Sequence, residues 1–129
     1  MRPLIDAHTL IWALDDPSQL GPQVIVELKN TANQLLLSAG TLWELAIKVG
    51  QKKLSLSLPY RQWMTKAIAD LNLSIVPITV DYADVQAGLP RHHGDPFDRL
   101  LVAQAMVEGI PIISADARLD AYGITRIWL

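Results

Sequence analysis

Five acidic residues of this chain occupy positions from which carboxylates can hold a divalent ion. Asp95 and Asp98 stand at the start of an apolar segment, and three further acids follow short apolar runs: Asp6, Glu44 and Asp116. Carboxylates that converge repel one another at neutral pH unless some pKa values rise or a cation joins them. The chain has no cysteine, so an ion must be held by oxygen or imidazole. This favours Mg2+ or Mn2+, which also bind phosphate oxygens and suit phosphodiester chemistry.

The two acids of the segment Asp95-Pro96-Phe97-Asp98 also have an ordinary structural explanation. Asp95 fits a helix N-cap, and Pro96 fits the first helical position. Asp98 fits the first turn, where the helix dipole favours an anion. We interpret Asp95 mainly as a cap that can also order its neighbours beside a metal. For Asp98 the structural and the metal-binding explanations both stay open.

The other three acids differ in how readily structure alone explains them. Thr41-Leu42-Trp43-Glu44 matches a capping box, in which Glu44 reaches back to the backbone of Thr41. Asp116 fits the N-cap of a helix that starts at residue 117. Asp6 is different, because a carboxylate directly after a buried strand is costly to desolvate without a partner. Asp6 is therefore the acid for which a functional role is favoured on its own.

The elements that must position these acids alternate along the chain. Unbroken apolar runs, typical of buried parallel strands, occur at Leu4–Asp6, Leu35–Ser38, Ser74–Ile78, Pro111–Ser114 and Arg126–Trp128. Helix-like segments lie between them, at roughly 9–14, 22–31, 41–49, 60–71, 80–88, 97–108 and 117–122. The alternation predicts an α/β fold with a parallel sheet covered on both faces, in a single domain over residues 1–129.

This topology predicts where the acids meet. In parallel sheets, ligands sit beyond the carboxyl ends of the strands. Asp6 closes the first strand, Glu44 lies a few residues past the second, and Asp116 lies just past Ser114. Asp98 enters the same edge from the N-terminus of its helix. We therefore expect four carboxylates to converge at one edge of the sheet.

Composition limits the classes of partner. The formal net charge of -2 argues against coating of nucleic acid by a uniformly basic surface. A local basic rim is still compatible with it, and such a rim guides a polyanion toward metals. The rim candidates, with a solvated surface as the alternative for each, are Lys48, Arg91, His92, His93 and Arg99. No paired histidine spacing typical of zinc sites is present.

Two further patterns complete the expectations. The start of the chain has no hydrophobic signal core and no run is long enough to span a bilayer, so we expect a cytoplasmic protein without a membrane partner. Trp12, Trp43 and Trp63 lie in helix-like stretches where an apolar stripe is expected. They are interpreted as packing residues, with a partner surface as the alternative.

The chain resembles the PIN-domain ribonucleases, specifically the VapC-like toxins of bacterial toxin–antitoxin modules. The resemblance is carried in order by four pieces that span nearly the whole sequence: Leu4–Trp12, Ser38–Lys48, Asp95–Ala105 and Ile112–Asp116. It implies a three-layer α/β/α fold with a central parallel sheet. It also implies a Mg2+- or Mn2+-dependent endonuclease that acts on RNA, is typically a homodimer and is inhibited by a cognate antitoxin.

The resemblance also implies residue roles. The four acids of the family fall on Asp6, Glu44, Asp98 and Asp116, and Ser114 stands where the family has a small hydroxyl residue near the last acid. Ala7 departs from the pattern, since the family often has Thr or Ser there. A hydroxyl beside the metal ligands is therefore missing, which affects the orientation of the site more than its ligands.

Two competing functions stay open at this stage. The first is a catalytically silent PIN-like scaffold for protein interaction, which predicts no metal-dependent activity. The second is a phosphoacceptor domain, which is weaker. It needs an acid pair at the first strand and a lysine after a late strand, whereas the sequence has Asp6-Ala7-His8 and Ser114-Ala115-Asp116.

Overall fold

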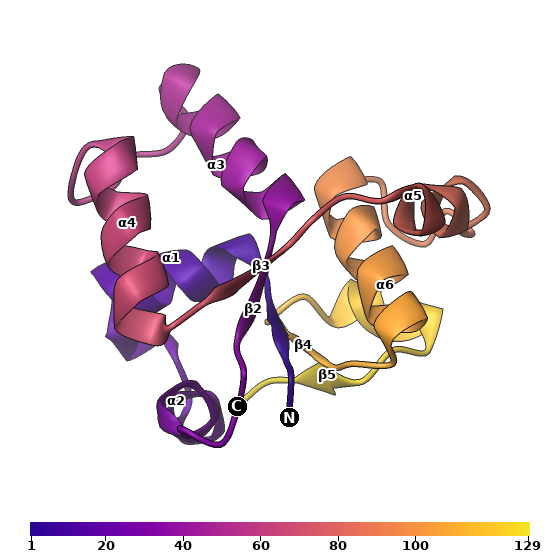
Figure 1. The fold of residues 1–129 in the computed structure, drawn as a ribbon, viewed down its shortest axis with the longest axis horizontal. Helices are drawn as coiled ribbons and strands as arrows, with labels where there is room; N and C mark the ends of the chain where they lie inside the picture. The colour runs from indigo at the N-terminus through magenta and orange to yellow at the C-terminus, as the bar shows by residue number, and fades with distance from the viewer.

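A single sheet of five parallel strands organises the chain in a computed structural model, which describes all 129 residues (Figure 1). The spatial order is β3-β2-β1-β4-β5. The strands are β1 Leu4–Ile5, β2 Leu36–Ser38, β3 Ser74–Val76, β4 Ile112–Ile113 and β5 Arg126–Ile127. Leu4 of the central strand pairs with Leu36 on one side and Ile112 on the other. The central strand thus ends next to β4, which sets Asp6 beside the segment leading to Asp116.

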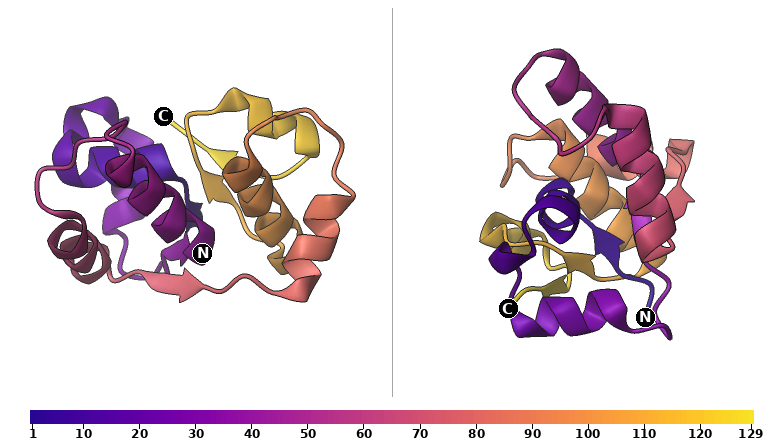
Figure 2. Two further views of the ribbon diagram at one scale, coloured as in Figure 1. Left: turned by 90° about the horizontal axis from the view of Figure 1, so that it is seen from above. Right: turned by 90° about the vertical axis from the view of Figure 1, so that its left-hand side faces the viewer.

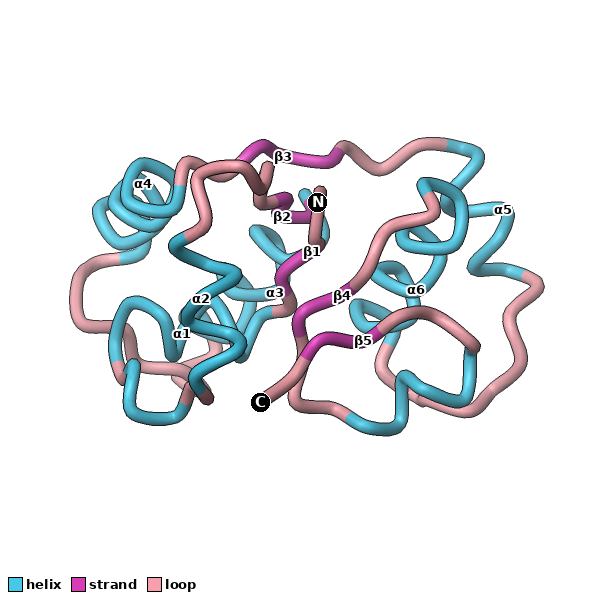
Figure 3. The backbone as a smooth tube through the Cα atoms, turned by 90° about the horizontal axis from the view of Figure 1, so that it is seen from below, coloured by secondary structure: helices cyan, strands magenta, loops and turns pink.

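Helices cover both faces of this sheet. The α-helices are α1 Ala7–Asp15, α2 Pro22–Lys29, α3 Ala39–Gly50, α4 Tyr60–Leu71, α5 Val80–Ala87 and α6 Pro96–Glu108. Two 3-10 segments are η1 Pro17–Gln19 and η2 Ala117–Tyr122. Seen from above, α1 to α4 gather on one side of the strands and α5 with α6 on the other (Figure 2). The view from below shows the same division (Figure 3). The predicted α/β/α architecture is confirmed.

Alternation along the short strands divides the core between the two faces. Ile5, Leu37 and Ile113 pack with α1, α2 and α4, in a cluster that includes the fully buried Trp63. Leu4 and Ile112 point the other way and pack with α5, α6 and η2. Because successive strand residues face opposite sides, each strand serves both layers. This rigid sheet fixes the loops at its carboxyl edge.

Two helix starts and the type of one helix differ from the sequence expectations. α3 begins at Ala39, where Ser38 is the N-cap and its Oγ accepts the backbone N–H of Gly40. Thr41 is therefore inside the helix, and the capping-box interpretation of Glu44 is wrong. α1 begins earlier than expected because Asp6 caps it. The last helical segment is a 3-10 helix, capped by Asp116 as expected.

The tryptophans do not all behave alike. Trp63 is buried and its indole N–H donates to Asp15, and Trp12 packs against the same core cluster. Trp43 is 63% exposed and meets only the ring edge of Phe97 among the aromatic residues. The packing interpretation is therefore wrong for Trp43, whose position on α3 faces away from the core.

None of the helices combines the length and the apolar character needed to cross a bilayer.

Candidate metal centre

Acidic side chains gather in one cavity at the carboxyl edge of the sheet. The cavity has a volume of about 310 Å³, and its only apolar lining side chain is that of Ala7. The elements α1, α3, α6 and the segment after β4 all contribute to its wall. The lining residues are Asp6, Ala7, His8, Glu44, Lys48, His93, Gly94, Asp95, Asp98, Asp116 and Arg118. The structure thus brings together all five acids that the sequence singled out.

Asp6 enters the cavity from the end of β1. Its backbone N–H donates to the carbonyl of Ile113, 3.2 Å away, which ties the end of β1 to β4. Its Oδ1 accepts the backbone N–H of Thr9 at 2.9 Å, so the same carboxylate caps α1. Only 5% of Asp6 is exposed. One carboxylate oxygen is thus used by the helix, and the other is left for the cavity.

Glu44 reaches the cavity from the second turn of α3. It is 5% exposed, and its Oε2 accepts a hydrogen bond from Lys48 Nζ at 2.7 Å, one helical turn away. This bond raises the pKa of Lys48 above its ordinary value, so the ammonium stays charged. Glu44 is therefore a buried carboxylate whose charge is balanced by one partly exposed lysine.

Asp95 and Asp98 occupy the first turn of α6 in different roles. Asp95 Oδ1 accepts the backbone N–H groups of Phe97 and Asp98, at 2.8 and 3.1 Å. Asp98 makes no cap, and its side chain is 24% exposed. Burial raises the pKa of Asp98 to about 7, and the carboxylate of Asp95 adds to the rise. Asp95 is therefore the N-cap of α6, as expected, and Asp98 is a carboxylate without a cap role.

Asp116 stands on the other side of the cavity, at the start of η2. Its backbone N–H donates to Ser114 Oγ at 3.0 Å, which orients it from a fully buried residue. Arg118 donates to both carboxylate oxygens, with Nε–Oδ1 and Nη2–Oδ2 distances of 3.0 Å. This pair holds the pKa of Asp116 well below its usual range. Asp116 is therefore ionised near neutral pH, whereas the carboxyl of Asp98 is partly protonated.

His93 links these two acids. Its Nε2 lies 2.7 Å from Asp116 Oδ2 and 3.3 Å from Asp98 Oδ2. Its Nδ1 accepts the backbone N–H of Asp95 at 3.0 Å. The residue is only 4% exposed. The sequence placed His93 on a phosphate-facing rim, and the structure contradicts this because the imidazole is buried among the carboxylates.

Arg99 also departs from the expected rim. Its guanidinium is buried and donates to the carbonyls of Gln86, Leu89 and Pro90 and to the hydroxyl of Tyr122. All its contacts lie within the protein, so an RNA-facing position is wrong for this side chain. Its planar fork fixes the segment that leads to His93.

The remaining rim candidates differ in whether they line the acidic cavity. Lys48 lines the cavity, whereas Arg91 and His92 are exposed but do not line it. The ring of His92 packs against the edge of Tyr122. Arg118, which the sequence did not single out, is exposed and lines the cavity. Its position two residues after Asp116 is the only signal that could have found it.

The donors fit a hard divalent cation. None of the five acids uses both of its carboxylate oxygens in a helix cap, and the raised pKa of Asp98 records unfavourable crowding of negative charge. A divalent ion relieves such crowding and needs only a few carboxylates. One ring nitrogen of His93 and one carboxylate oxygen each of Asp98 and Asp116 lie within 4.8 Å of one another. The residues present thus suit Mg2+ or Mn2+ without identifying which.

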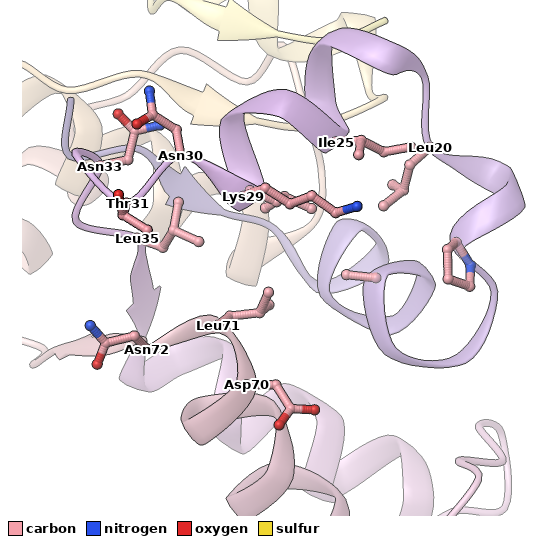
Figure 4. Close-up of a pocket in the computed structure, with 13 residues that line it drawn as sticks. Leu20, Ile25, Lys29, Asn30, Thr31, Asn33, Leu35, Asp70, Leu71 and Asn72 are labelled. Atoms are coloured by element: carbon pink, nitrogen blue, oxygen red, sulfur yellow. The ribbon is translucent and has the colours of Figure 1, made fainter.

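A second cavity lies elsewhere, between α1, α2 and α4 (Figure 4). Its volume is about 570 Å³, and its lining mixes apolar residues such as Leu20, Ile25 and Leu71 with asparagines. Asp70 is the only acid in its wall. It therefore lacks the clustered donors of the acidic cavity.

The comparisons with known proteins agree with this fold. The family model for the PIN domain matches residues 4–124. This chain belongs to the PIN domain family. This PIN domain is similar to Ribonuclease VapC22 of Mycobacterium tuberculosis (strain ATCC 25618 / H37Rv). The two sequences are 29% identical over 120 residues, which cover 92% of this chain and 90% of that relative.

The fold of this PIN domain is similar to that of proteins with solved structures. The structure of VapBC2 from Rickettsia felis bound to a promoter DNA fragment matches with a TM-score of 0.69 and 18% identity, covering 100% of both chains. FitAcB from Neisseria gonorrhoeae matches with a TM-score of 0.62 and 18% identity, over 96% of this chain and 95% of that one. The family and the three-layer fold predicted from the sequence are confirmed.

Proposed function

We propose that this PIN domain is a divalent-metal-dependent endoribonuclease and the toxin of a toxin–antitoxin pair. One observation carries the proposal: Asp6, Glu44, Asp98 and Asp116 line a single polar cavity at the carboxyl edge of the sheet. The name of the relative Ribonuclease VapC22 supports RNA as the substrate class. Mg2+ or Mn2+ bound there supplies Lewis-acid polarisation of a phosphate and a nucleophile derived from water.

The chain itself contributes orientation and charge. The sheet edge and the helix caps hold Asp6 and Asp98 in place, since Asp6 caps α1 and Asp95 caps the turn that carries Asp98. Lys48 and Arg118 are the cations in the cavity wall, and they attract the phosphate backbone. Each is paired with an acid of the site, Lys48 with Glu44 and Arg118 with Asp116.

The decisive experiment compares RNA cleavage by three proteins. Wild type with Mg2+ or Mn2+ is expected to give discrete new RNA ends, and Asp98→Asn is expected to give none. Asp84→Asn, an exposed acid on α5, is the matched control and is expected to cleave like wild type. Wild-type turnover by Asp98→Asn would sink the site assignment. Binding of Mn2+ without any cleavage would favour the scaffold instead.

The partners follow from the same proposal. The solved structures with this fold are those of VapBC2, FitAB and FitAcB, and this likeness supports a cognate antitoxin as partner. We further propose a homodimer, as the resemblance implies. Induced expression of the wild type alone is expected to arrest growth, and co-expression of the antitoxin is expected to relieve the arrest. Sedimentation of the purified protein measures the dimer directly.

A further inference from the structure

His93 has a role that neither the family match nor the relatives assign. Both of its ring nitrogens have defined partners, which fixes the orientation of the ring. Nδ1 receives the backbone N–H of Asp95, and Nε2 faces the carboxylates of Asp98 and Asp116. The residue is also held at its backbone, because its N–H donates to the hydroxyl of Tyr122 at 3.0 Å.

These contacts select one tautomer. A ring nitrogen that accepts a hydrogen bond carries its lone pair there, so the proton of a neutral imidazole sits on the other nitrogen. Because Nδ1 accepts from Asp95, Nε2 carries the proton and donates to Asp116. Nε2 then has no lone pair for a metal ion. His93 is therefore a donor to the acids and not a ligand beside them, although its ring lies within the acidic group.

We propose that His93 is a positioning residue, which donates from Nε2 to Asp116 and keeps the carboxylate of Asp98 3.3 Å from the same nitrogen, so that the two acids stay together as a pair. The inference rests on the proposed metal site. The two acids come from different elements, α6 and η2, and no hydrogen bond joins them directly. The imidazole N–H is the one group that contacts both. Partners of this kind set ligand orientation and typically change metal affinity by about 10- to 100-fold when removed.

The hydrogen bonds of His93 connect the N-cap residue of α6 to the acids of the site. Asp95 donates its backbone N–H to His93 and accepts backbone N–H groups of α6 on its side chain. The start of α6 and the imidazole are thus one hydrogen-bonded unit. A substitution of His93 therefore affects Asp98 in two ways. It changes the contact between the imidazole and the Asp98 carboxylate, and it changes the hydrogen bond to Asp95 at the start of α6. The test must separate these two effects.

Two substitutions separate the two ring nitrogens. In His93→Asn, Oδ1 takes the place of Nδ1 and still accepts from Asp95, but no donor reaches the carboxylates. In His93→Gln, the side-chain NH2 takes the place of Nε2 and donates to them, while the acceptor for Asp95 is lost. The probe is Mn2+ alone, titrated calorimetrically. His92→Asn, an exposed neighbour outside the cavity wall, is the matched control for affinity.

The positioning role predicts that His93→Asn weakens Mn2+ binding by about 10-fold or more, while His93→Gln stays within about threefold of wild type. Unfolding of the metal-free variants checks that both are folded. Equal loss in the two folded variants, or wild-type affinity in His93→Asn, overturns the proposal. If His93→Asn does not fold, His93→Gln still decides, because a large loss of affinity there contradicts a role for Nε2.

A second test of the proposal is spectroscopic and needs neither metal nor RNA. Nitrogen-15 spectra of the metal-free wild type are expected to show His93 as the Nε2–H tautomer, assigned by its absence in His93→Gln. The Nδ1–H tautomer would overturn the proposal. Wild type that binds Mn2+ but cleaves no RNA contradicts the proposed nuclease and leaves the positioning role standing. Wild type that binds no Mn2+ contradicts both, because the pair then positions nothing for a metal.

Discussion

The Oδ1 atom of Asp95 accepts the backbone N–H of Asp98 at 3.1 Å, so one acid of the pair holds the helix turn that carries the other. The cap satisfies N–H groups that a helix start otherwise leaves unpaired. Its cost is a negative charge close to Asp98, which contributes to the raised pKa of that carboxyl. The two acids are therefore coupled, although only Asp95 takes part in the cap.

Substitution of Asp95 separates capping from metal binding. Asn also accepts hydrogen bonds at an N-cap, so Asp95→Asn is expected to fold normally and to bind Mn2+ within a few-fold of wild type. Asp95→Ala loses the cap and is expected to lower the free energy of unfolding by about 1 kcal/mol. Urea unfolding and calorimetry measure the two quantities. A loss of Mn2+ binding in Asp95→Asn as complete as in Asp98→Asn would make Asp95 a ligand.

The raised pKa of Asp98 predicts how stability changes with pH in the absence of metal. The carboxyl has a pKa of about 7 when folded, against 3.8 as its ordinary value. Between these values the native state binds more protons than the unfolded chain, so this contribution is complete below the ordinary value and is lost as pH rises through about 7. Asp98→Asn removes the titration and should stabilise the metal-free protein by on the order of 3 kcal/mol at about pH 8.

Urea unfolding in chelator, at about pH 5 and about pH 8, checks this prediction. The difference between Asp98→Asn and wild type is expected to be clearly smaller at the lower pH than at the higher one. Asp116 has a lowered pKa, which acts in the opposite direction as pH falls. It is present in both proteins and largely cancels from the difference. A constant difference across pH would contradict the raised pKa.

Removal of Arg118 is expected to strengthen metal binding, whereas removal of an acid of the site weakens it. Its guanidinium contacts both oxygens of Asp116, so it competes with a cation for that carboxylate. Arg118→Ala is expected to bind Mn2+ a few-fold more tightly, because the competing positive charge is gone. The same variant is expected to raise the KM for RNA, since a cation of the cavity wall is lost. Arg61→Ala, an exposed arginine on α4, is the control. Weaker Mn2+ binding by Arg118→Ala would mean that Arg118 orients Asp116 for the ion.

The strand and helix pattern was readable from the sequence because the buried strands are continuous apolar runs. Ile112 and Ile113, for example, are both buried, one on each face of the sheet. The acids at strand ends followed from topology. The start of α3 was misplaced because Ser38 and Thr41 are both good caps, and only the packing of the strand end decides which one is used.

The environment of His93 could not be read in the same way. His92 and His93 are adjacent and chemically identical, yet one is exposed and the other buried. The difference depends on Tyr122, which lies 29 residues later and holds the backbone of His93. Contacts between residues so far apart in sequence arise only from the tertiary fold. The buried state of Arg99 has the same origin, since its partners lie on the segment before α6 and on η2.

Arg99 is predicted to act on stability. Its guanidinium donates to three backbone carbonyls and to the Tyr122 hydroxyl. Without the side chain the Leu89 carbonyl loses its donor, whereas Pro90 still accepts from Tyr122 and Gln86 from the backbone N–H of Leu89. Arg99→Lys keeps the charge but cannot reproduce the planar fork, so the free energy of unfolding is expected to fall by roughly 3 kcal/mol. Arg91→Ala, an exposed neighbour, is expected to change it by under about 0.5 kcal/mol. Urea unfolding measures both. Wild-type stability in Arg99→Lys, together with weaker RNA binding, would return Arg99 to the RNA-contacting residues.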